Sequence, residues 1–241
     1  MENYRPVSLL PIVSKVFKRC VLNSIKDHLY QVISPKQYGF CTGRSCVTNV
    51  LEALDHIGSI LDGGSQVDTS LPRYVKSFRQ SQSLRRIVHQ LTQAGFGGNL
   101  LNWFFSYLSS RRQRVTVLGA TSGDLPVTSG VPHGSILGPA LFLLYVNDLP
   151  EVISSSSRVL MIADDTKIFR EIKTLGDEDL GKLATWSQSS GLLFNEAKCK
   201  AQHITRKTKP ILSSYKLNNT APELYPAEKD LGIWINKDVQ W

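Results

Sequence analysis

The chain has 241 residues, 41% of them hydrophobic and 20% charged, which is the composition of a globular protein with a substantial core. It contains no apolar run of about 18 residues, and its N-terminus lacks the basic start and continuous apolar stretch of a signal peptide. We therefore expect an intracellular protein, in the cytoplasm, the nucleus or both, without a membrane partner. The net charge of +8 favours a polyanionic partner.

Two helices are predicted in the first quarter of the chain. Apolar residues recur at three- and four-residue steps from Val16 to Leu29, which predicts an amphipathic helix with Ser14 as its N-cap. A second helix is predicted over residues 47–61, ended by a Gly-Gly pair. Between the helices, Gly39 allows the backbone to approach a ligand closely, and Arg44 is placed to contact phosphate oxygens. A solvated loop arginine is the alternative.

The interval between Asp68 and Asp124 is unusual because its 55 residues include no Asp or Glu, where average usage would give roughly six. The same interval holds eight basic residues, a charge equal to the net charge of the whole chain. Apolar residues from Leu84 to Leu91 recur with a helical period. One interpretation is a basic amphipathic helix that binds a nucleic-acid backbone. The other is a segment substituted into a decayed sequence.

Periodicity and turn residues predict the remaining elements. Helices are predicted over residues 100–108, 136–145 and 179–186, and strands over 111–119, 125–131, 197–205 and 211–218. The first two of these strands are expected to be joined through Gly123 and Asp124. A turn rich in Gly and Pro, SGVPHGSILGP (residues 129–139), leads into the second of these helices.

The stretch RVLMIADDTKIFR (residues 158–170) predicts two strands joined by a tight turn at Ala163 to Thr166. An Asp-Asp pair in such a turn is ordinary turn chemistry when it stands alone. Carboxylate oxygens are also the ligands that Mg²⁺ prefers. Because neighbouring residues of a strand point to opposite faces, we expect Asp164 to be a direct metal ligand and Asp165 a peripheral partner.

Together these segments resemble the reverse transcriptases of non-LTR (LINE-like) retrotransposons. Six collinear blocks carry the resemblance: NYRPVSLL with SKVF (residues 3–10 and 14–17), QYGFCTGRSCVTN (37–49), SGVPHGSILGP (129–139), IADDTK (162–167), GLLFNEAKCK (191–200) and LGIWI (231–235). One family block is missing. Where the family has a short strand with a metal-binding aspartate, followed by a pattern like SKAFDxVxH, this chain reads VDTSLPRYVKSF (67–78). Asp68 lies several residues before the expected position.

The resemblance implies nucleotidyl transfer by two metal ions, Mg²⁺ or alternatively Mn²⁺. Asp164 and Asp165 then bind the metal and are catalytic, as is Lys198, the general acid for the departing pyrophosphate. Lys200 is an equally placed rival for that role. Contacts to nucleotide or template are implied for Arg44, Gly130, Val131, Pro132, His133, Gly134 and Ile162. His133 and Ile162 depart from the family, which has Gln and an aromatic residue there.

The implied fold is α+β: a right-hand polymerase palm, made of an antiparallel sheet with packed helices, plus partial fingers and no thumb. Three segments are expected: fingers and the start of the palm (1–66), an anomalous basic segment in place of the first catalytic strand (67–94), and the palm with the active-site hairpin (95–241). The implied partners are an RNA template, a DNA primer and deoxynucleoside triphosphates. The implied function is an RNA-directed DNA polymerase, impaired or inactive in this chain. The alternatives are a non-catalytic nucleic-acid-binding remnant and a pseudogene product that folds poorly.

Overall fold

A computed structural model of the chain describes residues 9–72, 74, 80–127, 134–172, 178–195, 198–211, 221–231 and 233–237. The chain divides into two compact units. We call them the helical unit, residues 1–33 and 76–146, and the sheet unit, residues 34–75 and 147–241. Within the described residues, no helix is long and apolar enough to cross a lipid bilayer.

The helical unit contains helices α1 (Ile12–Val32), α3 (Gln80–Gln93), α4 (Gly98–Leu108) and α5 (Gly138–Tyr145). Helix α3 packs against both α4 and α5, and its apolar face is buried. Arg86 ties α3 to α5 because its Nε donates to the carbonyl oxygen of Tyr145 at 3.2 Å. The helices predicted in these regions are confirmed, but Ser14 is not the N-cap of α1. The helix begins earlier, at Ile12, directly after Pro11.

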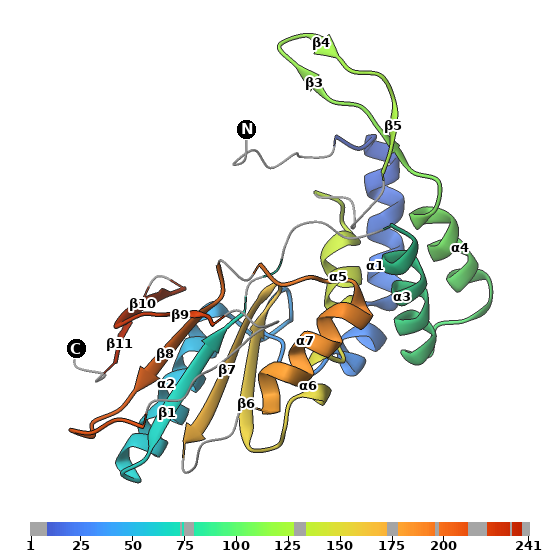
Figure 1. Ribbon diagram of the computed structural model, residues 1–241. Coiled ribbons are helices and arrows are strands. Elements are labelled where there is room, and N and C mark those ends of the chain that lie inside the picture. Colours follow the sequence, from blue (N-terminus) through green and yellow to red (C-terminus); the bar gives the residue numbers. More distant parts are fainter. Residues whose placement is uncertain are drawn as a thin grey trace. The chain divides into compact units, whose positions relative to one another are not determined.

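A β hairpin lies between α4 and α5 in the chain and extends away from the helices of its unit (Figure 1). Strand β2 (Arg112–Gln113) pairs with β5 (Leu125–Pro126), and β3 (Thr116–Val117) pairs with β4 (Ala120–Thr121). The chain reverses at Leu118 and Gly119, whose φ angles are +48° and +83°. The prediction that Gly123 and Asp124 form the connection was therefore wrong, since both belong to the returning arm.

The sheet unit is built on a sheet with strand order β6-β7-β1-β8-β9, in which only the β8–β9 pair is parallel. These strands are β1 (Gln66–Leu71), β6 (Ser157–Ile162), β7 (Asp165–Ile172), β8 (Lys200–Ile204) and β9 (Glu223–Leu224). Helix α2 (Cys46–Asp62) covers one face and α7 (Glu178–Ser190) the other (Figure 1). Helix α6 (Leu149–Val152) packs against α7, and β10 (Ala227–Asp230) pairs with β11 (Ile233–Asn236).

Helix α2 follows directly from its sequence. Ser45 caps it: its side chain accepts from the backbone N–H of Thr48, and the Thr48 side chain accepts from the backbone N–H of Ser45. Apolar residues at helical spacing then bury Ala53, Ile57 and Leu61 against the sheet. This packing fixes the helix across the strands that carry the Asp-Asp pair.

Strand β1 occupies the centre of the sheet, between β7 and β8. The expectation that a central strand has been replaced therefore needs correction, because residues 66–71 do form one. The basic helix predicted from Leu84 to Leu91 is also present, as α3, which begins four residues earlier, at Gln80. The three segment boundaries given above stay a prediction.

Asp179, at the start of α7, anchors this helix to the start of β6 and the residues just before it. Its carboxylate accepts from the backbone N–H of Ser154 at 3.0 Å, from the Ser154 hydroxyl at 2.9 Å and from the Ser157 hydroxyl. Arg170 Nη1 lies 3.8 Å from Oδ2. Burial by itself would raise the pKa of this carboxyl, but the hydrogen bonds and the arginine outweigh it and lower the pKa overall.

Replacing Asp179 with Asn should destabilise the protein in a pH-dependent way. A carboxyl whose pKa is lowered by folding contributes stability above its unfolded pKa of about 3.9, and this is lost as the pH falls through the folded value. We expect Asp179→Asn to reduce the free energy of unfolding by about 1.5–3 kcal/mol at pH 7, with a smaller difference below about pH 4. Urea denaturation at both pH values measures this. The exposed Asp55→Asn is the matched control, and an equal loss in both variants would contradict the assignment.

Candidate active site

The Asp-Asp pair lies at a two-residue reversal between β6 and β7. Ile162 pairs with Asp165 across the hairpin, so Ala163 and Asp164 form the turn itself. Ala163 has φ +52°, a left-handed conformation that costs a non-glycine residue roughly 1–2 kcal/mol. Asp164 is exposed, Asp165 is half-buried at the start of β7, and Ile162 is half-buried beside it. The predicted strands are confirmed, with a shorter turn than expected.

A neighbouring loop supports this turn through Gln37, whose side chain is almost fully buried. Its Oε1 accepts two hydrogen bonds, from the backbone N–H of Gly39 at 2.8 Å and from that of Ala163 at 2.9 Å. Backbone bonds continue the contact along β6: Tyr38 N–H donates to Met161 O at 2.8 Å, and Met161 N–H donates to Lys36 O at 2.9 Å. The loop therefore fixes the turn, which has an unfavourable backbone conformation of its own.

The approach between loop and turn is so close that only glycine fits at position 39. A Cβ atom on Gly39 would lie 2.5 Å from the backbone nitrogen of Ala163 and 3.2 Å from its Cα. Both of these are main-chain atoms, which cannot move aside as a flexible side chain would. Gly39 thus has a structural function at the hairpin.

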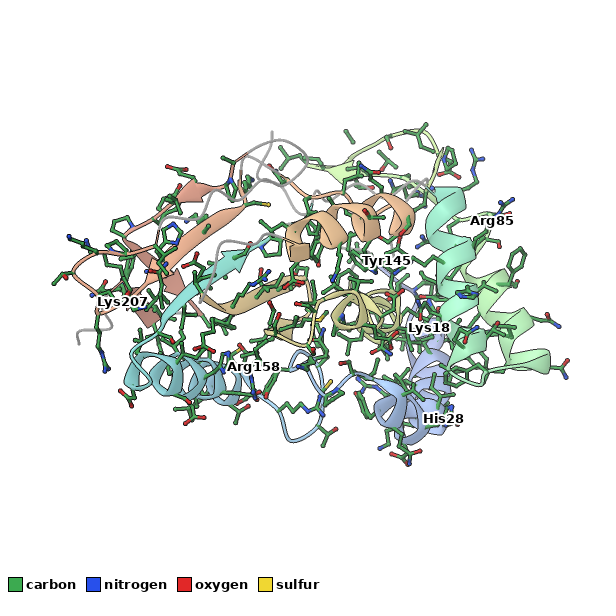
Figure 2. The ribbon with its side chains drawn as sticks, turned by 60° about the horizontal axis from the view of Figure 1, so that its bottom comes forward. Lys18, His28, Arg85, Tyr145, Arg158 and Lys207 are labelled. Atoms are coloured by element: carbon green, nitrogen blue, oxygen red, sulfur yellow. The ribbon has the colours of Figure 1, made fainter. Side chains whose placement is uncertain are left out.

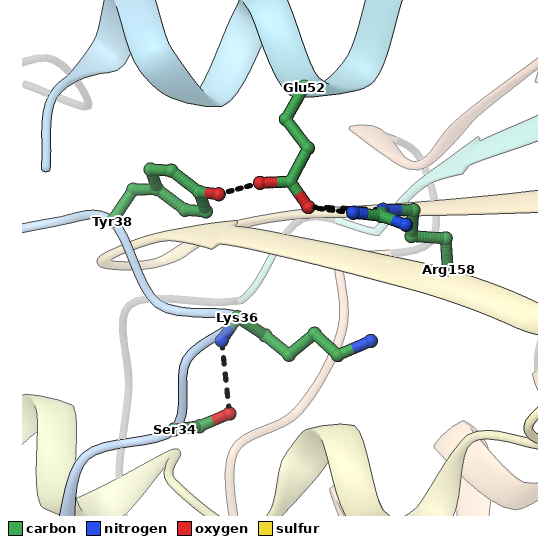
Figure 3. A network of polar contacts seen from close by, with 5 residues as sticks. All are labelled: Ser34, Lys36, Tyr38, Glu52 and Arg158. Carbon is green, nitrogen blue, oxygen red and sulfur yellow. Dashed lines mark hydrogen bonds and ion pairs between the residues drawn. The ribbon is translucent and has the colours of Figure 1, made fainter. Parts of the chain in front are cut away.

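A second set of contacts joins the loop, α2 and β6 (Figure 3). The Glu52 carboxylate on α2 accepts from the hydroxyl of Tyr38 and from the guanidinium of Arg158, whose Nε lies 3.1 Å from Oε1. Lys36 N–H donates to the Ser34 hydroxyl at 3.3 Å and completes the bend before the loop. These contacts hold the supporting loop on the sheet from the α2 side.

Asp68 does not join the hairpin aspartates. It pairs with Arg170 in the β1–β7 register, five residues along β7 from Asp165, which corresponds to roughly 17 Å. Its side chain, 4% exposed, accepts from Gln66 Nε2 at 2.8 Å and lies 2.8 Å from His203 Nδ1. Asp68 therefore lies too far along the sheet to share a metal ion with the hairpin aspartates.

Tyr74 is the described residue from this part of the chain that does reach the hairpin. Its hydroxyl lies 3.1 Å from Thr166 Oγ1, and its ring stacks on Phe194 with centroids 5.0 Å apart. Burial raises the pKa of Tyr74, and the negative charge of Asp164 raises it further. A neutral phenol therefore lies near the pair, and it supplies no carboxylate.

Three other predicted residues, Lys198, Lys200 and Arg44, belong to the sheet unit. Lys198 is exposed and follows the 191–195 segment, whereas the ammonium of Lys200 lies 4.3 Å from the centre of the Tyr225 ring. Arg44 is half-buried, and its Nη1 donates to the carbonyl oxygens of Ser34 at 3.1 Å and Gln37 at 2.6 Å. Arg44 thus shapes the supporting loop, and its role toward nucleotide stays a prediction.

The predicted glycine-rich turn belongs to the helical unit. Gly134 has φ +76°, a conformation that suits glycine. Gly130, Val131, Pro132 and His133 lie outside the described residues.

The hairpin has two carboxylates that could hold a metal ion. Mg²⁺ needs only one or two protein carboxylates when water and substrate phosphates complete its octahedron, so Asp164 and Asp165 are the residues that could hold it. A clamp of two ions needs ligands that bridge them. In the described parts of the chain, no group of three His, Cys, Asp or Glu side chains is arranged to hold a metal ion. The donor set therefore suits a single weakly held cation better than two.

The sequence does not predict the structural role of Gln37, although Gln37 begins one of the six blocks that resemble the family. A glutamine before Tyr-Gly gives no periodic signal, and its bond to Ala163 spans 126 positions of the chain. Gly39 was noted for ligand approach, but the group that approaches it is the hairpin backbone.

Comparison with known proteins identifies similar sequences across most of the chain. A family model described as reverse transcriptase (RNA-dependent DNA polymerase) matches residues 1–216. The probable RNA-directed DNA polymerase from transposon BS of Drosophila melanogaster is 28% identical over 253 residues, covering 98% of this chain and 28% of that protein. The RNA-directed DNA polymerase from the mobile element jockey of the same species is 27% identical over 269 residues, with 99% and 27% coverage. The chain thus spans less than a third of the length of these relatives.

Solved structures show a similar fold. Apo telomerase from Candida tropicalis, truncated from its C-terminal domain, matches with a TM-score of 0.55 and 12% identity over 92% of this chain and 44% of that one. Telomerase from Candida albicans, in complex with a fragment of telomeric RNA, matches with a TM-score of 0.54 and 12% identity, covering 93% and 36%. This likeness concerns the fold alone and confirms the predicted α+β, right-hand polymerase class.

Replacing Gly39 with Ala should displace the hairpin turn. The added methyl group would meet main-chain atoms, so we expect a loss of about 1–3 kcal/mol in the free energy of unfolding. Gly58→Ala is the control, because a Cβ there meets no atom within 4 Å and an alanine inside α2 should stabilise by about 0.5–1 kcal/mol. Chemical denaturation compares the two variants. If Gly39→Ala were as stable as wild type, the close approach would not exist in solution.

Proposed function

Because this chain belongs to the reverse transcriptase (RNA-dependent DNA polymerase) family, we propose that it is an RNA-directed DNA polymerase domain of the non-LTR type whose own primer extension is strongly impaired. Its substrates would be an RNA template, a DNA primer and deoxynucleoside triphosphates. The observation that carries the second half of the proposal is the distance of Asp68 from the hairpin. A folded palm with a supported Asp-Asp turn still lacks a third carboxylate there among the described residues.

The family suggests a role for each residue at or near the hairpin. Asp164 and Asp165 would hold Mg²⁺, or Mn²⁺, which when bound neutralises charge on the attacking and leaving oxygens. Lys198 is exposed and would donate a proton to the departing pyrophosphate, whereas the ammonium of Lys200 is placed over Tyr225. Ile162, next to the turn, would pack near the primer terminus.

Arg44, in the loop that supports the hairpin, and the glycine-rich turn at residues 130–134 would contact template or nucleotide. Arg44 has an Nη1 held by backbone carbonyls, which would aim the rest of its guanidinium. The turn from Gly130 to Gly134, through Val131, Pro132 and His133, would lie against the template or nucleotide.

The loss of one metal ligand should slow primer extension strongly. Metal clamping supplies several kcal/mol of transition-state stabilisation, and each 1.36 kcal/mol changes the rate tenfold. Losing the ligand that bridges two ions should therefore reduce extension on the order of a thousandfold or more.

A second candidate function, nucleic-acid binding without catalysis, is favoured by how charge is distributed between the units. The helical unit contains twelve Lys and Arg but only three Asp and Glu, a net charge of +9. The sheet unit contains sixteen and seventeen, a net charge of −1. Polymerisation needs metal and nucleotide, whereas backbone binding depends steeply on salt and needs neither.

Primer extension on a poly-A template with oligo-dT tests the proposal. We expect the folded wild-type protein to extend no faster than Asp164→Ala in the presence of Mg²⁺, because both have an incomplete metal site. Extension that disappears only in Asp164→Ala would show that another group completes the site.

A restored chain gives the positive arm of this experiment. Exchanging residues 67–78 for a strand of the family pattern, with its aspartate in register, should recover Mg²⁺-dependent extension. If a folded restored protein remained inert, the missing ligand would not account for the defect.

A further inference from the structure

The β hairpin between α4 and α5, residues 112–126, exposes an apolar tip. We call it the projecting hairpin. Leu118, at its reversal, is fully exposed, and Val115 and Val117 on the outgoing strand are each more than half exposed. Val117 pairs with Ala120 beside the reversal, so these side chains gather at the end that extends away from the helices (Figure 1). Apolar side chains this exposed contribute little to the stability of the fold.

Leu118 also has a backbone conformation that is unfavourable for leucine. Its φ is +48°, and Gly119 follows with φ +83°. A two-residue reversal with positive φ at both positions favours asparagine followed by glycine. Leucine at the first position lowers the stability of the turn, and its exposed side chain gains no burial in return. A strained residue that the fold does not use indicates contact with a ligand outside the fold.

The other face of the projecting hairpin is cationic. Alternate side chains of an extended strand share a face, which places Arg112 and Arg114 on one face and Val115 and Val117 on the other. Both arginines are exposed, and Arg112 Nη2 donates to the carbonyl oxygen of Asp124 at 3.0 Å. Asp124, on the returning arm, is the only acidic residue in the sequence of the hairpin. The hairpin therefore combines an apolar tip and face with a face that suits anions.

The charge of the surrounding unit favours nucleic acid as the partner. The helical unit contains twelve Lys and Arg and three Asp and Glu, and Arg85, exposed on α3, adds to the positive charge of its surface (Figure 2). Arginine binds phosphate oxygens, and apolar side chains such as leucine insert between base steps. A nucleic-acid strand presents phosphates and the apolar faces of bases close together, which matches the two faces of the hairpin.

We propose that the projecting hairpin is a wedge that inserts Leu118 at the junction between the paired and unpaired parts of a nucleic-acid duplex and keeps the strands apart. Val115 and Val117 would cover the first base pair, and the two arginines would contact the phosphates of one separated strand. Insertion costs least where a base is already unpaired, as at a junction. The choice of nucleic acid rests on the proposed function, whereas strand separation goes beyond it.

Binding of the full chain to a forked DNA duplex, in EDTA and without nucleotide, tests this proposal. 2-Aminopurine in the base pair at the fork reports unstacking by its fluorescence, and a blunt duplex of the same sequence is the reference. We expect wild type to raise the fluorescence at the fork. It should prefer the fork over the blunt duplex about tenfold, the effect of burying most of one leucine side chain. Leu118→Asn should lose both effects, and Leu118→Met should keep both.

The stability of Leu118→Asn separates binding from folding. Asparagine suits positive φ, so this variant should fold at least as well as wild type. Loss of the fork preference with an unchanged or higher melting temperature would assign the leucine to binding. A lower melting temperature would show that Leu118 stabilises the fold, and this would overturn the proposal.

Leu9→Asn is the matched control, because Leu9 is an exposed leucine of the same unit outside the hairpin. It should keep the fork preference. Arg114→Gln should weaken binding to both duplexes and make the slope of log K against log salt shallower by about 0.7–0.9, the effect of one lost phosphate contact. The proposal is overturned if Leu118→Asn keeps the fork preference, if Leu9→Asn loses it equally, or if Arg114→Gln keeps the wild-type slope.

Sedimentation velocity tests whether the tip binds protein instead. Self-association of wild type that disappears in Leu118→Asn, without any fork preference, would assign the tip to a second copy of the chain and overturn the proposal. These assays do not depend on polymerase activity. A chain that opens the fork but never extends a primer would keep the wedge, whereas a chain that extends a primer without fork preference would lose the wedge alone.

Discussion

The pair of hydrogen bonds accepted by the Gln37 side chain is the contact on which the candidate site depends. One oxygen accepts from Gly39 on the supporting loop and from Ala163 in the turn, which joins the loop to the turn beyond the backbone hydrogen bonds that the loop makes with Met161. Ala163 has a left-handed conformation that is unfavourable for alanine. Without the loop, little would hold the exposed Asp164 in one orientation. The loop is itself fixed from the other side by Glu52, which binds both Tyr38 and Arg158.

Carboxylates at the hairpin and in the centre of the sheet are stabilised in different ways. Two adjacent carboxylates at a turn repel each other. Water weakens this repulsion, and a bound cation reduces it further. Asp68, in the middle of the sheet, instead accepts a hydrogen bond from Gln66 and lies 2.8 Å from His203 Nδ1, and a buried carboxylate needs such polar neighbours. These contacts hold the Asp68 side chain in the centre of the sheet, away from the hairpin. The protein therefore has the fold of a polymerase palm. Its described residues place no third carboxylate at the hairpin that could bridge two ions.

Much of the fold was predictable from local sequence patterns. The helices α1 to α5 and the β6–β7 hairpin follow from periodicity, and the Ser45 cap from its residue type. The errors came from contacts between distant segments. Strand β1 was missed because Val67 and Leu71 surround polar residues that are buried only in the centre of a sheet covered on both faces. The reversal at Leu118 was missed because leucine is unfavourable at positive φ.

The candidate site was predictable only in its chemistry. The adjacent aspartates predict a cation site. The turn that carries them is held by Gln37 and Gly39, which are more than 120 positions away in the chain. The burial of Lys18 was not predicted, because a single lysine within an amphipathic helix gives no sign that it will be buried. The contacts at the turn and the burial of a side chain depend on strand register and packing, which one sequence does not reveal.

A titration of the folded protein with Mn²⁺, with the free ion followed by electron paramagnetic resonance, measures how many ions the hairpin holds. We expect at most one bound ion per chain, lost in Asp164→Ala and kept in Asp68→Asn. Two bound ions, both lost in Asp164→Ala, would show that the hairpin has a further ligand and a complete metal site.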